Sequence, residues 1–596
     1  MSASRRRNFS LCLAGVGGFA ALVHLALSYP ACLHVADSVP GEMSDGVSAL
    51  GHVWLVYYNV LQRHGGFAFT RMAFYPSGIV FCVRPLLAWY ALLGYVGGFF
   101  TNNLVLWYNL GLIASSVVTA MGVWMLGFRL TRSGAAALLA VVLYTFSTRR
   151  MDNLQAHINY YSTGFLVWSV VAMQTGLRRH SGARPWVMAG IIWAMQVWQS
   201  PDMAFYIGFC WAPLALWYWW RAWADRARGV GTGRLVWAPL LSPCFPALSF
   251  LPILIAAVPY LHLRLSYDEV IWPRTHWFEF LYPSPRHFLY RPWGRFIERL
   301  FFDPGHHEAF IGFGGLVATA VFFAVCAFRL KRMRPWILLS VLALLLTLGK
   351  SLSIPRVLDV PLPYGLMLHL PVLKELRVPA RFTTILTLGV SLMGAMGWTV
   401  CRRRRLRATG LLWALLFGLA LLDGWLVPLP FTKLRNDPRY YPMRLLEKIR
   451  RDPRRDICVL GVPVQIPSTR SQAQQMIHEH PTYDGFDPRL REEQIEQLRL
   501  GPIRFLLAGV GGVSIAQSEK SLAAEGSAMS VAEFRRRIEP AHLKYILLTD
   551  YENRQAASQR RLIRHYFDVA GEETDGFWTL FTLRIPLARG FVSDHD

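Results

Sequence analysis

Apolar runs that can cross a lipid bilayer dominate the sequence. Of 596 residues, 53% are hydrophobic, and the 22 tryptophans exceed what the core of a soluble protein requires. A helix rises about 1.5 Å per residue, so about 20 apolar residues cover a hydrocarbon core of about 30 Å. The sequence therefore predicts a mainly α fold, a polytopic transmembrane helical bundle. Its eleven predicted spans, the short ones tilted or completed by their flanks, lie near residues 8–29, 103–127, 133–147, 158–176, 185–200, 204–220, 236–260, 309–328, 336–349, 381–400 and 409–428.

The placement of arginine decides the orientation of these spans, because cytoplasmic connections carry the excess of Lys and Arg. The run Leu86–Phe100 has fifteen residues and would reach only about 22 Å, so we expect it to lie in the membrane interface. Every strong cluster then falls on the cytoplasmic side with the N-terminus, and the C-terminus lies outside. Arg149 and Arg150 are exceptions on an outer loop. The inside clusters are Arg5–Arg7, Arg129 with Arg132, Arg178–Arg184, Arg221–Arg234, Arg329–Arg334 and Arg402–Arg407.

Charge and cysteine content exclude other classes of protein. A net charge of +25 would indicate nucleic acid binding in a soluble chain, but the clusters between apolar runs account for it, so no nucleic acid partner is expected. The eight cysteines are scattered without a CxxC pair, which indicates neither a zinc site nor a disulfide framework. Ser4–Tyr29 resembles a signal peptide but lacks a convincing small-residue cleavage site, so we expect a retained first helix.

The composition changes near residue 431, where apolar runs shorten to strand length. We therefore divide the chain into a transmembrane domain at residues 1–430, with large outer loops at 30–102 and 262–308, and a soluble extracytoplasmic α/β domain at 431–596. "AGVGGVS" (Ala508–Ser514) has the wrong glycine spacing for a nucleotide-binding loop. The predicted strands are Asp456–Val464, Lys544–Asp550 and Trp578–Pro586, and the predicted amphipathic helices are Leu490–Leu500 and Asn553–Phe567.

The first outer loop places two acids, Glu42 and Asp45, beside small residues in "SVPGEMSDGVSALGHVW" (Ser38–Trp54). Such an acid can simply cap a helix, here Gly46–Leu61. Other outer turns add polar groups, however, so we expect one cavity and an active site at the membrane boundary. The residues on those turns are Asp152, His157 and Asp202.

The order of these elements resembles the GT-C superfamily of multi-spanning glycosyltransferases, and within it a bacterial YfhO-like branch. The resemblance starts with "GEMSDGVSALGHVW", continues through "FYPSG" and covers most of the chain. Its most specific stretch is Arg-Val-Pro-Ala-Arg-Phe at the entry to a span. The other matching stretches are "RRMDNLQAHINYYSTGFLVW" (Arg149–Trp168), "HHEAFIGFGGL" (His306–Leu316), "LKELRVPARFTTILTLGVSLMGAMG" (Leu373–Gly397) and "QAQQMIHEHPTYDGFDPR" (Gln472–Arg489).

The resemblance implies transfer of a sugar, usually with inversion, from a polyprenyl-phosphate-linked donor to an envelope glycan, lipid or protein acceptor on the non-cytoplasmic side of the bacterial inner membrane. Asp45 matches the family's first-loop acid and would act as general base, because the attacking hydroxyl must lose a proton. Arg377 and Arg381 would stabilise the departing phosphate. They can equally anchor the chain to membrane lipid headgroups.

Other features depart from the family or keep two interpretations. Ser44 replaces the paired acid common in this loop, which leaves open whether Glu42 assists and whether a metal is bound. Mg²⁺ or Mn²⁺ would be held only if three loops converge; histidines on such turns are otherwise structural. The residues concerned are His157, His306, His307, Asp152 and Glu308, and we expect His157, Asp152, Glu308 and Asp202 to contact substrate. The loop aromatics, either an interfacial belt or a sugar-stacking surface, are Trp272, Trp277, Tyr282, Tyr290 and Trp293.

Two other functions fit the same composition. A transporter or flippase of lipid-linked saccharide should show repeated halves and broken or charged helices near the midplane. The sequence shows no internal repeat and keeps its acids in loops, which favours the enzyme. A non-catalytic organiser of envelope polysaccharide assembly is the third hypothesis.

Overall fold

The chain forms two compact units in a computed structural model. The helical unit comprises Met1–Glu42, Arg84–Leu254 and Glu269–Phe431, and the sheet unit comprises Met43–Val83, Ile255–Asp268 and Thr432–Asp596. Residues Met43–Val83, part of the predicted first outer loop and named here the first outer segment, thus cluster with the C-terminal part of the chain. The structure describes residues 3–41, 45–64, 66–67, 69–75, 78–80, 86–155, 157–178, 182–227, 236–258, 275–284, 287–301, 309–325, 333–354, 358–369, 378–405, 408–434, 439, 441–454, 457–462, 469–483, 503, 506, 530–550, 553 and 556–584.

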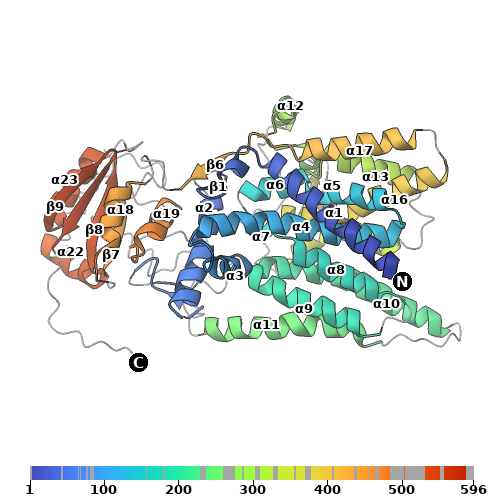
Figure 1. Ribbon diagram of the computed structural model, residues 1–596, viewed down its shortest axis with the longest axis horizontal. Helices are drawn as coiled ribbons and strands as arrows, with labels where there is room; N and C mark the ends of the chain where they lie inside the picture. Colours follow the sequence, from blue (N-terminus) through green and yellow to red (C-terminus); the bar gives the residue numbers. More distant parts are fainter. Residues whose placement is uncertain are drawn as a thin grey trace. The chain divides into compact units, whose positions relative to one another are not determined.

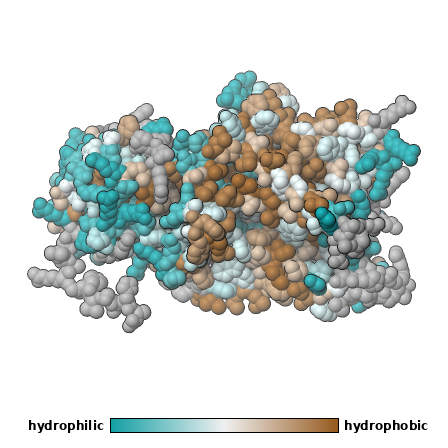
Figure 2. Space-filling view, in the orientation of Figure 1, coloured by the Kyte–Doolittle hydropathy of each residue, from teal (hydrophilic) through white to brown (hydrophobic). Residues whose placement is uncertain are grey.

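The helical unit is built from the predicted apolar runs. Apolar side chains cover its helices on the face drawn in Figure 2. Its longer elements (Figure 1) are α1 (Ala3–Leu27), α3 (Ala88–Gly97), α4 (Leu104–Thr131), α5 (Gly134–Thr145), α6 (Thr148–Gln155), α7 (Ile158–Tyr161), α8 (Gly164–Gly176), α9 (Arg184–Gln199), α10 (Pro201–Ala227), α11 (Leu241–Ala257), α12 (Arg291–Phe301), α13 (Phe313–Val325), α14 (Arg334–Thr347), α15 (Pro363–Met367), α16 (Thr383–Arg403) and α17 (Thr409–Asp423), with strands β1 (Ser38–Pro40), β4 (Ser351–Ile354) and β5 (Leu358–Pro361).

Four of the described helices are long and apolar enough to cross a membrane by length and composition. The predicted run at 158–176 is two helices, because the chain breaks at Ser162 and Thr163 between α7 and α8. The hydroxyls of Ser162 and Tyr90 lie 2.6 Å apart at this break. The four long apolar segments are Arg7–Leu27, Leu104–Thr131, Ala238–Ile255 and Pro379–Arg403.

Helix α16 is the centre of the helical unit. It is buried almost throughout and packs against α5, α13 and α14. Glycines permit this close approach: a Cβ at Gly394 would lie 2.7 Å from the Cβ of Ala318, and one at Gly397 would lie 3.1 Å from the Cα of Phe322. Small residues of this kind let helix backbones pack closely where lipid gives no hydrophobic driving force. The segment that carries Arg381 therefore leads into a helix that is buried over most of its length.

The sheet unit contains a four-stranded mixed sheet in the order β7-β8-β10-β9. β7 runs parallel to β8, while β10 pairs antiparallel with both β8 and β9. The three strands predicted from sequence are present as β7, β8 and β10; the predicted helix at 490–500 lies outside the described residues. The elements of this unit are α2 (Asp45–Leu55), a π-helical turn (Val56–Gln62), β2 (Phe69–Thr70), β3 (Ile79–Val80), α18 (Met443–Arg450), β7 (Cys458–Val462), α19 (Thr469–His478), α22 (Val531–Ile538), β8 (Leu543–Thr549), α23 (Ala556–Tyr566), β9 (Val569–Asp575) and β10 (Trp578–Leu583), with β6 (Phe431–Lys433) at the boundary between the units.

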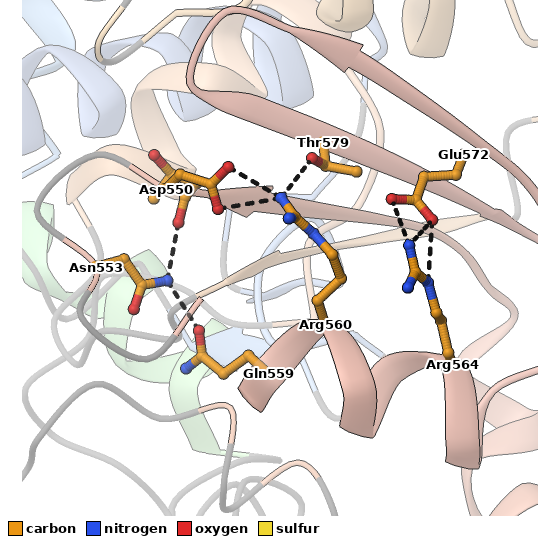
Figure 3. Close-up of polar contacts among 8 residues, drawn as sticks. Asp550, Asn553, Gln559, Arg560, Arg564, Glu572 and Thr579 are labelled. Carbon is orange, nitrogen blue, oxygen red and sulfur yellow. Dashed lines mark hydrogen bonds and ion pairs between the residues drawn. The ribbon is translucent and has the colours of Figure 1, made fainter. Parts of the chain in front are cut away.

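Helix α23 is joined to this sheet by two arginines one turn apart (Figure 3). Arg560 Nη2 donates to both carboxylate oxygens of Asp550, at 3.1 and 2.9 Å, and to the hydroxyl of Thr579 at 3.0 Å. Arg564 forms a bidentate pair with Glu572 on β9, with a shortest distance of 2.8 Å. Forked guanidinium–carboxylate contacts carry orientation as well as charge. They fix the face of α23 that packs on β8 and β10.

Acid should destabilise the sheet unit through His478 at the end of α19. Burial, and secondarily its neighbour His480, lowers the pKa of His478 from 6.5 to about 3. The folded state holds the neutral ring, so the unfolded chain takes up the proton first and stability falls as the pH drops below about 6.5. At about 1.4 kcal/mol per pH unit, lowering the pH from 7 to 5 should cost about 2 kcal/mol. Thermal unfolding of the full chain in detergent at both pH values measures this loss, which His478→Gln should reduce. Equal pH dependence in both proteins would contradict the assignment.

Candidate active site

Tyr160 is the point at which three of the predicted site residues meet. Its hydroxyl donates to Asp202 Oδ2 at 3.1 Å, and the guanidinium carbon of Arg381 lies 4.4 Å from its ring centroid. The ring of His157 packs edge-on against it, with centroids 6.1 Å apart. The three partners come from the start of α10, the 3₁₀ helix Pro379–Phe382 and the residue before α7. The structure thus brings together Asp202, Arg381 and His157 around a tyrosine that the sequence analysis did not select.

An aromatic wall holds this cluster in place. Phe382 follows Arg381 in the chain, and its ring meets Tyr206 and Phe209 edge-on at 4.8 and 4.9 Å between centroids. Tyr364 on α15 contacts the same ring at 6.4 Å. Edge-to-face aromatic pairs each add about 0.5–1.5 kcal/mol beyond their buried area. Tyr160 itself is 2% exposed, while Asp202, His157 and Arg381 are each partly exposed. The polar edges of the cluster are therefore accessible and its centre is not.

A small cavity with Tyr160 in its wall is lined by residues that carry polar groups. Its volume is about 10 Å³, enough for about one water molecule. Arg149, Arg150 and Asn153 contribute to the cavity wall from α6. The two arginines that break the positive-inside pattern are thus buried, so they do not lie on the surface of an outer loop. The other lining residues are Tyr144, Ser147, Tyr160, Thr163, Thr384 and Thr387.

Arg150 is a buried cation whose partners are all neutral among the described residues. It is 3% exposed, and its Nε and Nη1 donate to the carbonyls of Tyr161 and Thr145 at 2.9 and 2.7 Å. Its guanidinium carbon lies 4.0 Å from the Tyr161 ring centroid. Longer contacts reach the hydroxyls of Ser115, Ser116 and Thr119 on α4. This guanidinium ties the turn that carries Tyr160 to α4 and α5.

Asp152 has a separate environment. Its Oδ1 accepts from the Ser284 hydroxyl at 3.1 Å. Nearby, His287 accepts from the Tyr290 amide at Nδ1, 3.2 Å, so its Nε2 is assigned as the donor to the Leu422 carbonyl at 2.7 Å. Burial lowers the pKa of His287, partly offset by the Leu422 carbonyl and by Asp152. These contacts support a structural role for Asp152, in holding the loop at 275–284 against α6.

The remaining predicted site residues lie in the sheet unit or outside the described residues. Asp45 is the first residue of α2, in the sheet unit, and the structure describes its backbone but not its side chain. Glu42, Arg377 and Glu308 lie outside the described residues, as do His306 and His307. Within the part of the chain that the structure describes, no three His, Cys, Asp or Glu side chains are grouped closely enough to hold a metal ion.

The fold of the chain is similar to the folds of two solved glycosyltransferases of the GT-C type. The Archaeoglobus fulgidus oligosaccharyltransferase, in a complex with Zn and sulfate, matches with a TM-score of 0.50 and 13% identity over 96% of this chain and 74% of that chain. Arabinofuranosyltransferase AftD from Mycobacteria matches with a TM-score of 0.56 and 14% identity over 98% of this chain, which spans 40% of that chain. At these identities the likeness concerns the fold alone. No protein-family model matches the sequence, and no curated protein matches it.

Two substitutions of Tyr160 should separate its hydroxyl from its ring. Tyr160→Phe removes the bond to Asp202 and should lower the free energy of unfolding by about 1 kcal/mol. Tyr160→Leu also removes the surface on which Arg381 lies and leaves a cavity, which should cost about 3 kcal/mol. Chemical denaturation in detergent measures both values. Equal losses for the two variants would show that the ring does not support the cluster.

Proposed function

We propose that this protein is a membrane glycosyltransferase that moves a sugar from a polyprenyl-phosphate donor to an envelope acceptor on the extracytoplasmic face of the bacterial inner membrane. Its GT-C fold supports the class, and the YfhO-like pattern of its sequence supports the lipid-linked donor. The observation that carries the proposal is the convergence of Arg381, Asp202 and His157 on Tyr160. In the proposed topology the N-terminus is cytoplasmic and the C-terminal domain is extracytoplasmic.

Arg381 serves the leaving group in this proposal. When the bond between the anomeric carbon and the phosphate oxygen breaks, negative charge grows on the polyprenyl phosphate. A guanidinium stacked on an aromatic ring keeps its fork in one orientation, and a partly exposed fork can meet a phosphate oxygen from the membrane side. A preorganised cation of this kind is worth more in a water-excluded site than in bulk water. Arg377, four residues earlier, is proposed as a second phosphate contact.

Asp45 serves the acceptor. The acceptor hydroxyl attacks the anomeric carbon from the face opposite the phosphate, its proton passes to the Asp45 carboxylate, and the phosphate leaves with the bonding electron pair. The new glycosidic bond has inverted configuration. Glu42, three residues before Asp45, is proposed to assist, and Asp202, His157 and Glu308 are proposed to contact the donor sugar or phosphate.

A divalent metal is kept as a separate proposal. Mg²⁺ or Mn²⁺ would neutralise donor phosphate charge if Glu308, His306 and His307 supplied ligands together with Asp152 or His157. The hydrogen bond that Asp152 accepts from Ser284 and the packing of His157 on Tyr160 do not favour this use of either residue. No step above depends on the metal.

Replacing Asp45 with Asn should abolish transfer without loss of expression. The amide keeps the size of the side chain and cannot accept the hydroxyl proton, so we expect the rate to fall by about 10²- to 10⁴-fold. Transfer is measured as the change in lipid-linked sugars and envelope glycans, by mass spectrometry, in cells that carry each variant. Asp37→Asn is the matched control, because Asp37 is another acid of the first outer loop and its partners are His34 and Ser38. Full activity of Asp45→Asn would refute the enzyme and leave transport or scaffolding.

Arg381 should matter as a fork as well as a charge. Arg381→Gln removes the charge and should lower kcat/KM by about 10²- to 10³-fold, as for other transition-state donors. Arg381→Lys keeps the charge but loses the planar fork, so its kcat/KM should lie between that of Arg381→Gln and that of the wild type. Arg295→Gln, on an exposed face of α12, is the control and should retain activity. A glutamine variant as active as wild type would reduce Arg381 to a lipid-facing anchor, and a fully active lysine variant would show that the charge suffices without the fork.

A further inference from the structure

The first outer segment is folded onto the C-terminal domain. Helix α2, which begins at Asp45, packs on α19 within the sheet unit (Figure 1). Gly51 makes the approach possible, because a Cβ at this position would overlap the side chain of Gln472. Gln472 is itself buried, so it has little room to move away. Close packing of α2 on α19 therefore requires glycine at position 51.

The Met72 carbonyl is one of the groups that join the second half of this segment to the domain. The Met72 carbonyl accepts from the Thr482 amide at 2.9 Å and from the side-chain amide of Gln475. The same Gln475 nitrogen also donates to the His480 carbonyl at 3.1 Å. Both hydrogens of the carboxamide are thus used, and Gln475 is only 1% exposed. A buried donor shared between two backbone carbonyls fixes the distance between the chain segments that carry them.

These bonds continue into the central sheet. The Tyr75 amide donates to the Thr482 carbonyl at 2.9 Å, so Met72 and Tyr75 bracket Thr482. The other side of residues 481–483 pairs with β7. The Val459 amide donates to the Pro481 carbonyl, and the Val459 carbonyl accepts from the Tyr483 amide, both at 2.9 Å. Residues 481–483 thereby cover the β7 edge of the sheet, which would otherwise expose backbone groups, and Met72 and Tyr75 bond to the opposite side of Thr482.

Two of the sequence stretches noted for their resemblance therefore meet here. "FYPSG" supplies Phe74 and Tyr75, and "QAQQMIHEHPTYDGFDPR" supplies Gln472, Gln475 and Thr482. Neither stretch has a role in the chemistry of the transfer. Their contact instead joins α2, the helix that starts with Asp45, to the segment that pairs with β7.

We propose that the C-terminal domain positions the catalytic base, and that Gln475 is the positioning residue that holds the first outer segment to it. The inference rests on the proposed function of Asp45. Misplacement of a reacting group by about 1 Å can cost about 100-fold in rate. Loosening the Gln475 contact should therefore lower kcat far more than it lowers donor binding.

The test compares two buried glutamines of the same domain. Gln475→Met keeps the length of the side chain and removes the two donated bonds. Gln559→Met makes the same change at a residue that is also 1% exposed but contacts Asn553 and Leu506. In the full-length protein, Gln475→Met should lower kcat at least tenfold with KM within twofold of wild type, while Gln559→Met should leave both unchanged. Equal kcat values for the two variants would overturn the proposal.

A second pair of variants approaches the contact from α2. Gly51→Ala introduces the overlap with Gln472 and should lower kcat, and the double variant Gly51→Ala/Gln472→Ala should restore it by removing the opposing side chain. This rescue would not follow from a general loss of helix stability. A Gly51→Ala protein with wild-type kcat, or a double variant no better than the single one, would count against positioning.

Hydrogen exchange separates this proposal from the proposed function, since it needs no turnover. Amides of residues 46–55 should exchange faster in Gln475→Met than in wild type or in Gln559→Met. If exchange there is unchanged, the positioning role fails even when Asp45→Asn is inactive. If exchange is faster in Gln475→Met while Asp45→Asn keeps full activity, Gln475 does hold the first outer segment to the domain. The assignment of Asp45 as the base then fails, and with it the claim that the domain positions a base.

Discussion

Much of the site depends on how one buried guanidinium is satisfied. Arg150 lies in a helical unit where an unpaired polar group costs several kcal/mol, and its donors reach carbonyls and hydroxyls on α4, α5 and α7. The Tyr161 carbonyl and ring are two of its contacts. Because Tyr160 is the adjacent residue, the direction of its side chain follows from this arrangement. The positions of Asp202, His157 and Arg381 around Tyr160 depend in turn on that direction.

The sequence predicted many of the helices and selected some of the residues that the structure brings together in the candidate site, for identifiable reasons. Apolar length located the helices, and the alternation of short apolar and charged runs located β7, β8 and β10. Arg381 and Asp202 were selected by chemistry and position, and the structure joins them through Tyr160. Tyr160 itself was part of a noted stretch but was treated as one aromatic residue among many. The role of a tyrosine can be inferred only when its neighbours are known. Two of these neighbours, Asp202 and Arg381, lie more than 40 and 200 positions away in the sequence.

Arg149 and Arg150 show that charge along the sequence does not reveal the tertiary contacts of an arginine. A charge count can only assign an arginine to one face of a membrane or the other, and these two broke the count. Burial is a third possibility, and for Arg150 it depends on carbonyls that are left open at the ends of α5 and α7. Similarly, the division at residue 430 followed composition along the chain, whereas residues 43–83 cluster with the sheet through contacts that composition does not reveal.

The bond from Gln475 to the Met72 carbonyl spans 403 positions of sequence, and this separation has a consequence for biosynthesis. At about 5–20 residues per second, the ribosome needs roughly 20–80 s to deliver the partner of a segment that has already left the exit tunnel. During that interval the nascent protein can insert its first helices while the loop that follows α1 has nowhere to dock. Docking of the loop is thus among the last folding events of synthesis. A polypeptide terminated before Gln475 would reach the membrane with this loop undocked.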